Sequence, residues 1–89
     1  MFIDKARFTQ SKHAIQRQSE RKIGILDVLH VLKTGKEEKN KTKFDSDFQV
    51  WKYAIRGYTV ENHDIRIIIA FDETGMLIIT VMHVIKEKI

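Results

Sequence analysis

Residues 11–35 read SKHAIQRQSERKIGILDVLHVLKTG and predict two short helices separated by a glycine. Ser11 is a natural N-cap, because its hydroxyl can accept a hydrogen bond from an otherwise unpaired amide of the first turn. The first helix is therefore expected from Lys12 to Arg21. The second is expected from about Ile25 to Lys33, where apolar residues recur at three- and four-residue spacing. A glycine follows each helix as its stop signal.

Strands are predicted downstream of the helices. The segment from Val50 to Val60 is aromatic and β-branched, Ile65 to Phe71 is almost continuously apolar, and Met76 to Ile85 forms the last strand. The loop at residues 72–75 ends in glycine, as expected of a hairpin. The polar stretch at residues 36–43 is expected to be a loop or an exposed edge strand. The predicted fold is α+β, with two N-terminal helices packed on a three- to four-stranded antiparallel sheet.

Length and composition favour one cytoplasmic domain. With 89 residues, the chain is long enough for one domain, expected over residues 1–89, and too short for two. It contains no cysteine, so neither a disulfide framework nor a thiolate zinc site can be proposed. The longest apolar run is far shorter than a membrane span, and the first residues lack the apolar core of a signal peptide.

Positive charge is concentrated in the N-terminal part of the chain. The net charge is +4, and residues 1–33 carry seven basic side chains against three acidic ones. Residues 34–43 add four lysines against two glutamates. Such asymmetry indicates an acidic partner for this half of the chain, for which nucleic acid is the commonest choice. The alternative is that a small domain needs net charge only for solubility.

One face of the first helix carries the strongest candidate for chemistry. His13, Arg17 and Arg21 follow one another at four-residue steps, so they share a face. Guanidinium groups offer planar forks of donors to a phosphate, and an imidazole can accept, donate or shuttle a proton near neutral pH. The structural alternative is a solvated basic face, with His13 capping the helix or packing against the sheet edge.

The predicted strands supply a second set of polar and aromatic side chains. Alternation allows Arg56 and Arg66 to project from a common surface, which could hold a nucleic-acid backbone, or which could be ordinary solvent-facing alternation. Aromatic residues of the same strands could stack on bases, although Trp51 is expected in the core of so small a domain. His83 lies in an apolar strand and is expected to be structural, and His30 is expected at the rim of the second helix.

Other common classes of catalytic site are not indicated. The histidines and carboxylates show no recognisable metal-ligand spacing, and the chain has no glycine-rich phosphate loop. Ser11 has no partner arrangement that would make it a nucleophile. A metal enzyme and a serine hydrolase are therefore disfavoured, and neither a metal nor a cofactor is expected.

Several motifs resemble one bacterial family. The run SKHAIQRQSERKI follows the pattern Ser-x-His-Ala-x-x-Arg-x-x-x-Arg-x-Ile, and it is followed by DVLHVLKTGK. An aromatic strand ending near glycine, WKYAIRGY, and a closing apolar strand, LIITVMHV, continue the pattern. Together these motifs resemble the family called domain of unknown function 4258, over roughly residues 8 to 85. That family is similar to RelE-like and colicin-nuclease-like toxins, in which two helices pack on a four-stranded antiparallel sheet.

The resemblance implies an RNA-cleaving toxin domain, or a relative of one. The residues that match are His13, Arg17 and Arg21 of the helix motif and Thr80 of the last strand. We expect a metal-independent endoribonuclease in which His13 acts as acid or base and the arginines stabilise the phosphate. The expected catalytic set is His13, Arg17, Arg21 and Arg66, and the expected RNA-binding set is Lys12, Lys22, Arg56, Tyr53, Tyr58 and Thr80.

Two classes of function stay open at this point. The first is the toxin half of a toxin–antitoxin or mobile-element system, with RNA as substrate, an acidic antitoxin protein as partner, and no membrane or metal. The alternative is a non-catalytic module that keeps the same fold and binds RNA or a protein. A phosphate-contacting surface would lose RNA affinity steeply as salt rises, which a protein-docking surface would not.

Overall fold

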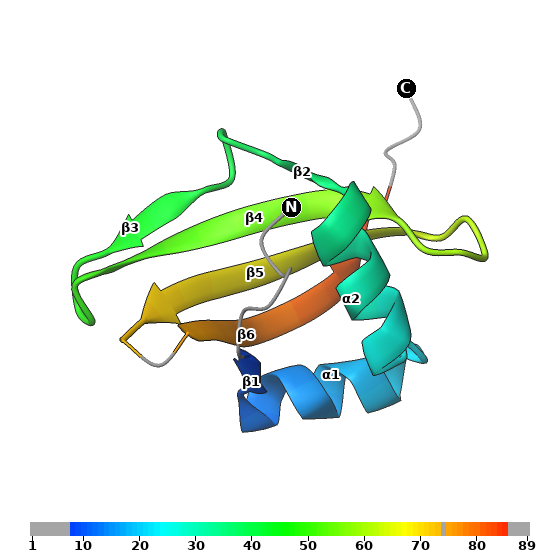
Figure 1. Cartoon of the computed structure of the whole chain (residues 1–89), viewed down its shortest axis with the longest axis horizontal. Coiled ribbons are helices and arrows are strands. Elements are labelled where there is room, and N and C mark those ends of the chain that lie inside the picture. The colour runs from blue at the N-terminus through cyan, green and yellow to red at the C-terminus, as the bar shows by residue number, and fades with distance from the viewer. Residues whose placement is uncertain (1–7, 74, 86–89) are drawn as a thin grey trace.

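A computed structural model describes residues 8–73 and 75–85 of the chain. Two helices lie on one face of a twisted sheet, and the hairpin ends of the sheet project past them (Figure 1). The elements follow in the order β1 (Phe8–Gln10), α1 (Lys12–Arg21), α2 (Ile25–Thr34), β2 (Lys36–Glu37), β3 (Lys43–Asp45), β4 (Val50–Tyr58), β5 (Asp64–Asp72) and β6 (Gly75–His83).

Both helices confirm the prediction from residues 11–35. The Ser11 hydroxyl accepts a hydrogen bond from the Ala14 amide at 2.9 Å, as expected of an N-cap. At the start of α2, Asp27 accepts from the Gly24 amide at 3.0 Å. Each helix has ten residues, and no helix in the described part of the chain is long and apolar enough to cross a membrane.

The predicted sheet was wrong in both strand number and direction. Instead of a three- to four-stranded antiparallel sheet, the chain forms a six-stranded mixed sheet in the order β1-β6-β5-β4-β2, with β3 also paired to β4. The three long strands form the expected antiparallel meander. β1 pairs in parallel with residues 76–78 of β6, which makes the sheet mixed.

The prediction missed the short strands because they are too short to be recognised in the sequence. β1, β2 and β3 have three, two and three residues, too few to show the alternation by which a strand is recognised in a sequence. Tertiary hydrogen bonds hold them instead. For example, the Thr42 hydroxyl accepts from the Ala54 amide at 3.2 Å and so ties the segment before β3 to β4.

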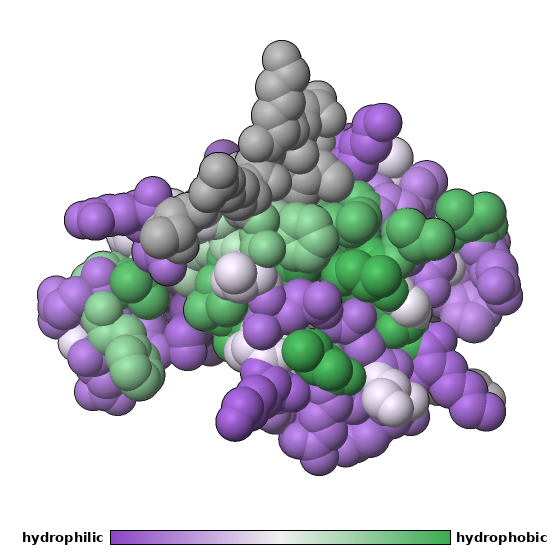
Figure 2. All heavy atoms as spheres, turned by 60° about the horizontal axis from the view of Figure 1, so that its bottom comes forward, coloured by the Kyte–Doolittle hydropathy of each residue, from purple (hydrophilic) through white to green (hydrophobic). Residues whose placement is uncertain are grey.

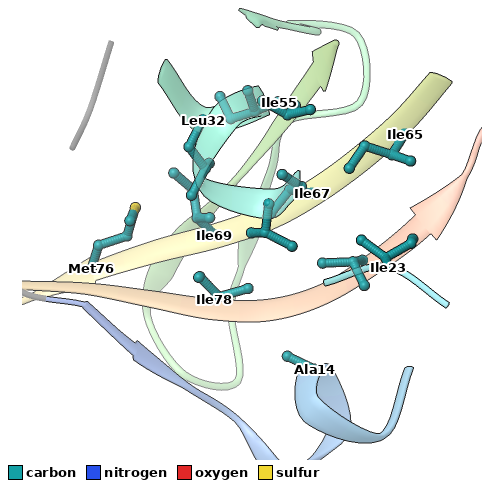
Figure 3. Close-up of a cluster of buried hydrophobic side chains, with 12 residues drawn as sticks. Ala14, Ile23, Leu32, Ile55, Ile65, Ile67, Ile69, Met76 and Ile78 are labelled. Atoms are coloured by element: carbon teal, nitrogen blue, oxygen red, sulfur yellow. The ribbon is translucent and has the colours of Figure 1, made fainter. Parts of the chain in front are cut away.

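The hydrophobic core lies between the helices and one face of the sheet. Aliphatic side chains of β4, β5 and β6 meet α2 and the single small residue Ala14 of α1 (Figure 3). Paired residues such as Ile55, Ile67 and Val81 point to this face, because directly opposed side chains of neighbouring strands project to the same side. The residues between them project to the other face, which no helix covers in the described chain (Figure 1).

Two glycines allow α2 to approach β4 closely. A Cβ atom on Gly35 would lie 2.6 Å from the carbonyl oxygens of both Arg56 and Val31. A Cβ atom on Gly57 would lie 3.0 Å from the Cα atom of Gly35. Gly57 pairs with Ile65 in regular register, and the register shift of the sheet lies between Ile68 and Ile69 of β5. The missing side chain of Gly57 makes room for the end of α2.

Replacing Gly35 by alanine is expected to lower the free energy of unfolding by about 1–3 kcal/mol, the usual cost of overpacking. The new methyl group would meet two backbone oxygens, which cannot rotate away as a side chain can. Chemical denaturation of the wild type and the variant measures the difference.

Gly24→Ala is the matched control, because its Cβ atom would meet only Asp27 Oδ2, at 3.6 Å. Both glycines have negative φ angles, −78° at Gly35 and −80° at Gly24, so alanine is not excluded by backbone conformation at either position. Equal losses in the two variants would contradict the steric explanation.

Candidate functional site

The exposed face of α1 carries the residues predicted from the helix motif. Ala14 and Gln18 are its buried residues, so His13 and Arg17 lie towards solvent. Arg17 Nη1 lies 2.6 Å from Glu20 Oε1, which makes an ion pair along the helix. The same pairing lowers the pKa of Glu20. Arg17 is therefore already partly neutralised by a neighbour on its own helix.

Arg21, at the end of α1, reaches the edge of the sheet. Its guanidinium Nη1 donates to the carbonyl oxygen of Val81 in β6. β1 pairs only with residues 76–78, so it leaves this part of the β6 edge without a strand partner. Arg21 thus lies beside the end of β6, and its other guanidinium donors can serve a ligand.

His83, the last residue of β6, is held by the backbone of α1. Its Nε2 atom lies 3.0 Å from the carbonyl oxygen of Arg21. A carbonyl oxygen can only accept, so Nε2 carries the hydrogen of this bond. In the neutral ring Nδ1 then has a free lone pair, as in histidines that a neighbouring acceptor holds in one tautomer. His83 is exposed and presents a proton-accepting nitrogen.

His63 brings a second imidazole to the same place. The ring centroids of His63 and His83 lie 5.9 Å apart, with 50° between the ring planes. The turn between β4 and β5 fixes His63, because its amide donates to the Thr59 hydroxyl at 3.0 Å and its carbonyl accepts from the Thr59 amide at 2.9 Å. Thr59 is buried and anchors that turn. Arg21, His63 and His83 are called the histidine–arginine cluster below.

Arg66 lies on the opposite face of the sheet from His13. Its neighbours Ile65 and Ile67 are both buried in the core, so its own side chain projects away from the helices. There Arg66 Nε and Nη2 contact the two carboxylate oxygens of Glu38, at 2.5 and 3.2 Å. The predicted catalytic set is therefore divided, with three residues on α1 and Arg66 on the open face.

Arg56 belongs to the same group of charges on the open face. Its Nε and Nη2 atoms contact the carboxylate of Asp64 at 3.0 and 2.7 Å, and Nη1 lies 3.5 Å from Glu38. Hydrogen bonding from Arg66 lowers the pKa of Glu38, and Asp64 raises the pKa of Arg56. Two guanidinium groups and two carboxylates thus neutralise one another. Glu38, Arg56, Asp64 and Arg66 are called the open-face ion network.

The other predicted RNA-binding residues are dispersed. Lys12 and Lys22 are exposed at the two ends of α1. Tyr53 is half-buried against Phe71, with ring centroids 5.9 Å apart. Tyr58 is 49% exposed at the end of β4, and Thr80 is half-buried on the open face, opposite Ile68.

Two expectations about single residues changed. Trp51 was expected in the core but is 52% exposed, because it lies at the hairpin end of the sheet, beyond the helices. His63 belongs to none of the motifs identified in the sequence. Strand order could have indicated its position: in a meander, the turn before β5 lies beside the end of β6, where His83 stands. His30 is half-buried on α2, as expected for a rim position.

Within residues 8–73 and 75–85 no group of three or more histidine, cysteine, aspartate or glutamate side chains could hold a metal ion. In its fold and site, the molecule is an α+β domain with a histidine–arginine cluster at one end of a mixed sheet. Residues 10–83 match the family described as "Domain of unknown function (DUF4258)", and the chain belongs to that family. Comparisons with curated proteins and with solved structures gave no significant match.

Proposed function

We propose that this protein is a metal-independent endoribonuclease whose reaction takes place at the histidine–arginine cluster. The observation that supports it is the pair of exposed imidazoles, with ring centroids 5.9 Å apart. His83 contacts the backbone carbonyl of Arg21, and the Arg21 guanidinium binds the carbonyl of Val81, two residues before His83. RNA cleavage by the ribose 2′-hydroxyl needs a base for its proton, an acid for the leaving oxygen, and a cation for the pentavalent phosphorane. The cluster contains one group for each requirement.

The orientation of His83 supports the following roles in the proposed reaction. Neutral His83 takes the 2′-hydroxyl proton at Nδ1 while the 2′-oxygen attacks phosphorus. The bond from phosphorus to the 5′-oxygen breaks, and protonated His63 gives its proton to that oxygen. Arg21 donates to the phosphorane oxygens with the donors that Val81 leaves available. The products are a 2′,3′-cyclic phosphate and a 5′-hydroxyl end.

The predicted residues of α1 keep a role in this proposal. Lys12, His13, Arg17 and Lys22 would contact the RNA backbone that leads to the cluster, rather than the reacting phosphate. Arg56, Tyr58, Arg66 and Thr80 project to the open face of the sheet, whereas His83 lies opposite the core residue Ile65 on the helix face. The proposal therefore gives these four residues no part in the reaction. The toxin role, with an acidic antitoxin as partner, stays part of the proposal and rests on the likeness to bacterial nuclease toxins expected of the family.

Incubation of the purified protein with single-stranded RNA in EDTA tests the proposal. We expect fragments with 2′,3′-cyclic phosphate and 5′-hydroxyl ends, identified by mass spectrometry. Induction in bacteria is expected to arrest growth. Intact RNA after prolonged incubation, together with normal growth on induction, would contradict the proposal.

A second function, a non-catalytic RNA- or protein-binding module, is favoured by a different observation. Three predicted phosphate-binding arginines already contact carboxylates of the same chain: Arg17 with Glu20, Arg56 with Asp64, and Arg66 with Glu38. A module of this kind would leave RNA intact. Its RNA affinity would fall steeply with salt if the remaining cations bind phosphates, and would be negligible if the surface docks a protein.

A further inference from the structure

Aromatic rings line a hollow at the hairpin end of the sheet, far from the histidine–arginine cluster. The hollow has a volume of about 240 Å³, and Trp51, Tyr53 and Phe71 surround it together with Gln49 and Val50. Tyr53 lies opposite Ile69 of the core, so the rings face the same side of the sheet as the helices. The hairpins extend past those helices (Figure 1), which leaves the rings uncovered by them.

These rings gather partly exposed apolar surface at one end of the sheet. Trp51 is 52% exposed, Phe44 46% and Phe71 39%. Phe44 packs edge-on against Trp51 at 5.4 Å, and Tyr53 packs edge-on against Phe71 at 5.9 Å, each with 66° between the planes. Figure 2 shows hydrophobic side chains at the surface of this end, on the left. Apolar surface gathered in this way is typical of a binding site.

We propose that this hollow binds an unpaired base of single-stranded RNA. The inference rests on the proposed function and names its substrate class. Every nucleobase has a flat π-face that stacks on aromatic side chains, and single-stranded RNA is recognised mainly in this way. A base within a duplex could not enter the hollow without leaving its own stack.

Gln49 adds a polar group suited to the edge of a base. Its Nε2 atom donates to the carbonyl oxygen of Ser46 at 2.7 Å, which fixes the orientation of the amide. Its Oε1 atom has no partner in the part of the chain that the structure describes, so it can accept from an exocyclic amino group. An amide beside three rings matches a heterocycle with polar edges better than a purely apolar side chain.

Charge connects the hollow to the histidine–arginine cluster. α1 lies on the same face of the sheet as the rings, and along it Lys12, His13, Arg17 and Arg21 lead to the cluster, with Glu20 as the one acidic residue of the helix (Figure 1). The α1 side of the molecule is largely hydrophilic (Figure 2). A phosphate backbone can follow these cations, and this complementarity favours RNA over an apolar protein segment.

The separation of the two sites defines the length of the substrate. β5 runs from the cluster end to the hairpin end over nine residues, which corresponds to about 27 Å at the usual strand rise. A bound RNA would therefore extend over several unpaired nucleotides, with a base in the hollow and the scissile phosphate at the histidines.

Trp51 is the single tryptophan of the chain, so its fluorescence reports directly on the hollow. The probe is a 2′-O-methyl RNA of about ten nucleotides, a length within single-strand site sizes, which cannot be cleaved because its nucleophile is blocked. We expect saturable quenching of Trp51 fluorescence by the single strand and little by its duplex. Anisotropy of the same labelled strand measures total binding.

Substitution separates stacking from charge. Trp51→Ala is expected to weaken binding of the 2′-O-methyl strand at least about fivefold with an unchanged salt slope, because stacking involves no phosphate. Arg17→Gln is expected to reduce the salt slope by about one ion contact. Phe48→Ala is the control, since Phe48 is 76% exposed on the same hairpin but does not line the ring hollow.

Each outcome decides between the proposals. RNA binding without quenching, equal quenching by the duplex, or equal losses in the Trp51 and Phe48 variants would overturn the base-binding hollow alone. Cleavage of unmodified RNA without quenching would leave the endoribonuclease intact and reject the hollow. Absence of both RNA binding and cleavage would reject the endoribonuclease and the base-binding hollow, and would favour a protein as the ligand of the aromatic rings.

Discussion

A His83→Asn variant is expected to lose RNA cleavage by a factor of about 10²–10⁴, the usual contribution of general acid–base catalysis. His83 Nε2 contacts the Arg21 carbonyl at 3.0 Å. Asparagine keeps a polar side chain at this position, although its amide is nearer the backbone than Nε2, and it has no nitrogen that can take a proton. Initial rates of cleavage of a labelled RNA in EDTA measure the loss. His63→Asn is expected to show a loss of similar size, because the leaving oxygen then lacks its acid.

His30→Asn is the matched control, since His30 lies on α2 and outside the cluster. It is expected to cleave RNA at the wild-type rate. RNA affinity should stay unchanged in the His83 variant, because His83 acts on the reacting atoms and the cations of α1 supply the binding. Wild-type cleavage by His83→Asn would remove the cluster from the mechanism, even if the protein proved to be a ribonuclease.

A Glu38→Gln variant is expected to lower the free energy of unfolding at neutral pH by about 3 kcal/mol, because it breaks one half of a largely buried ion pair. The side chains of Glu38 and Arg66 are only 17% and 18% exposed. Removal of the carboxylate leaves the Arg66 guanidinium without its charged partner and weakens the contact with Arg56. Denaturant unfolding of both proteins gives the difference.

Acidification should abolish the difference in unfolding free energy between the wild type and Glu38→Gln. Hydrogen bonding from Arg66 lowers the pKa of Glu38 from its ordinary value of 4.5 in the folded protein. A carboxyl group with a lowered folded pKa stabilises the protein above its unfolded pKa, and that contribution disappears as pH falls through the folded value. The wild type and Glu38→Gln should therefore converge in stability only when the pH has fallen below the lowered folded-state pKa of Glu38.

Glu37→Gln provides the comparison, because it removes the same charge one residue earlier. Glu37 forms no salt bridge within the described chain, so the change is expected to stay within about 0.5 kcal/mol. A gap between wild type and Glu38→Gln that persists unchanged at acidic pH would show that packing, rather than charge, accounts for the loss.

The helices and the long strands were predictable because each has a local cause. Ser11 caps α1, and apolar periodicity marks α2 and the three long strands. The parallel strand β1 has no such cause within its three residues, since its pairing with β6 is settled by the tertiary fold. The sequence pattern therefore predicted the antiparallel meander of the three long strands, but it did not predict the number of strands or the parallel pairing of β1.

The candidate site was predictable only in part, for a related reason. The spacing of His13, Arg17 and Arg21 correctly places them on α1, because helical geometry is local. The approach of His83 to Arg21 depends on the position of α1 along β6, and the approach of His63 depends on strand register. Likewise, nothing in the sequence near Arg66 indicates that Glu38 neutralises it.

The covering of the β6 edge by α1 has a consequence for solubility. Ser11 and Arg21 donate to the carbonyl oxygens of Ile79 and Val81, where a neighbouring strand would otherwise bond. An open strand edge invites pairing with other chains and so promotes aggregation. The two side chains therefore act as a barrier to self-association. Arg21 would combine this protection with its role in catalysis, and its replacement would uncover the edge as well as remove a phosphate-binding group.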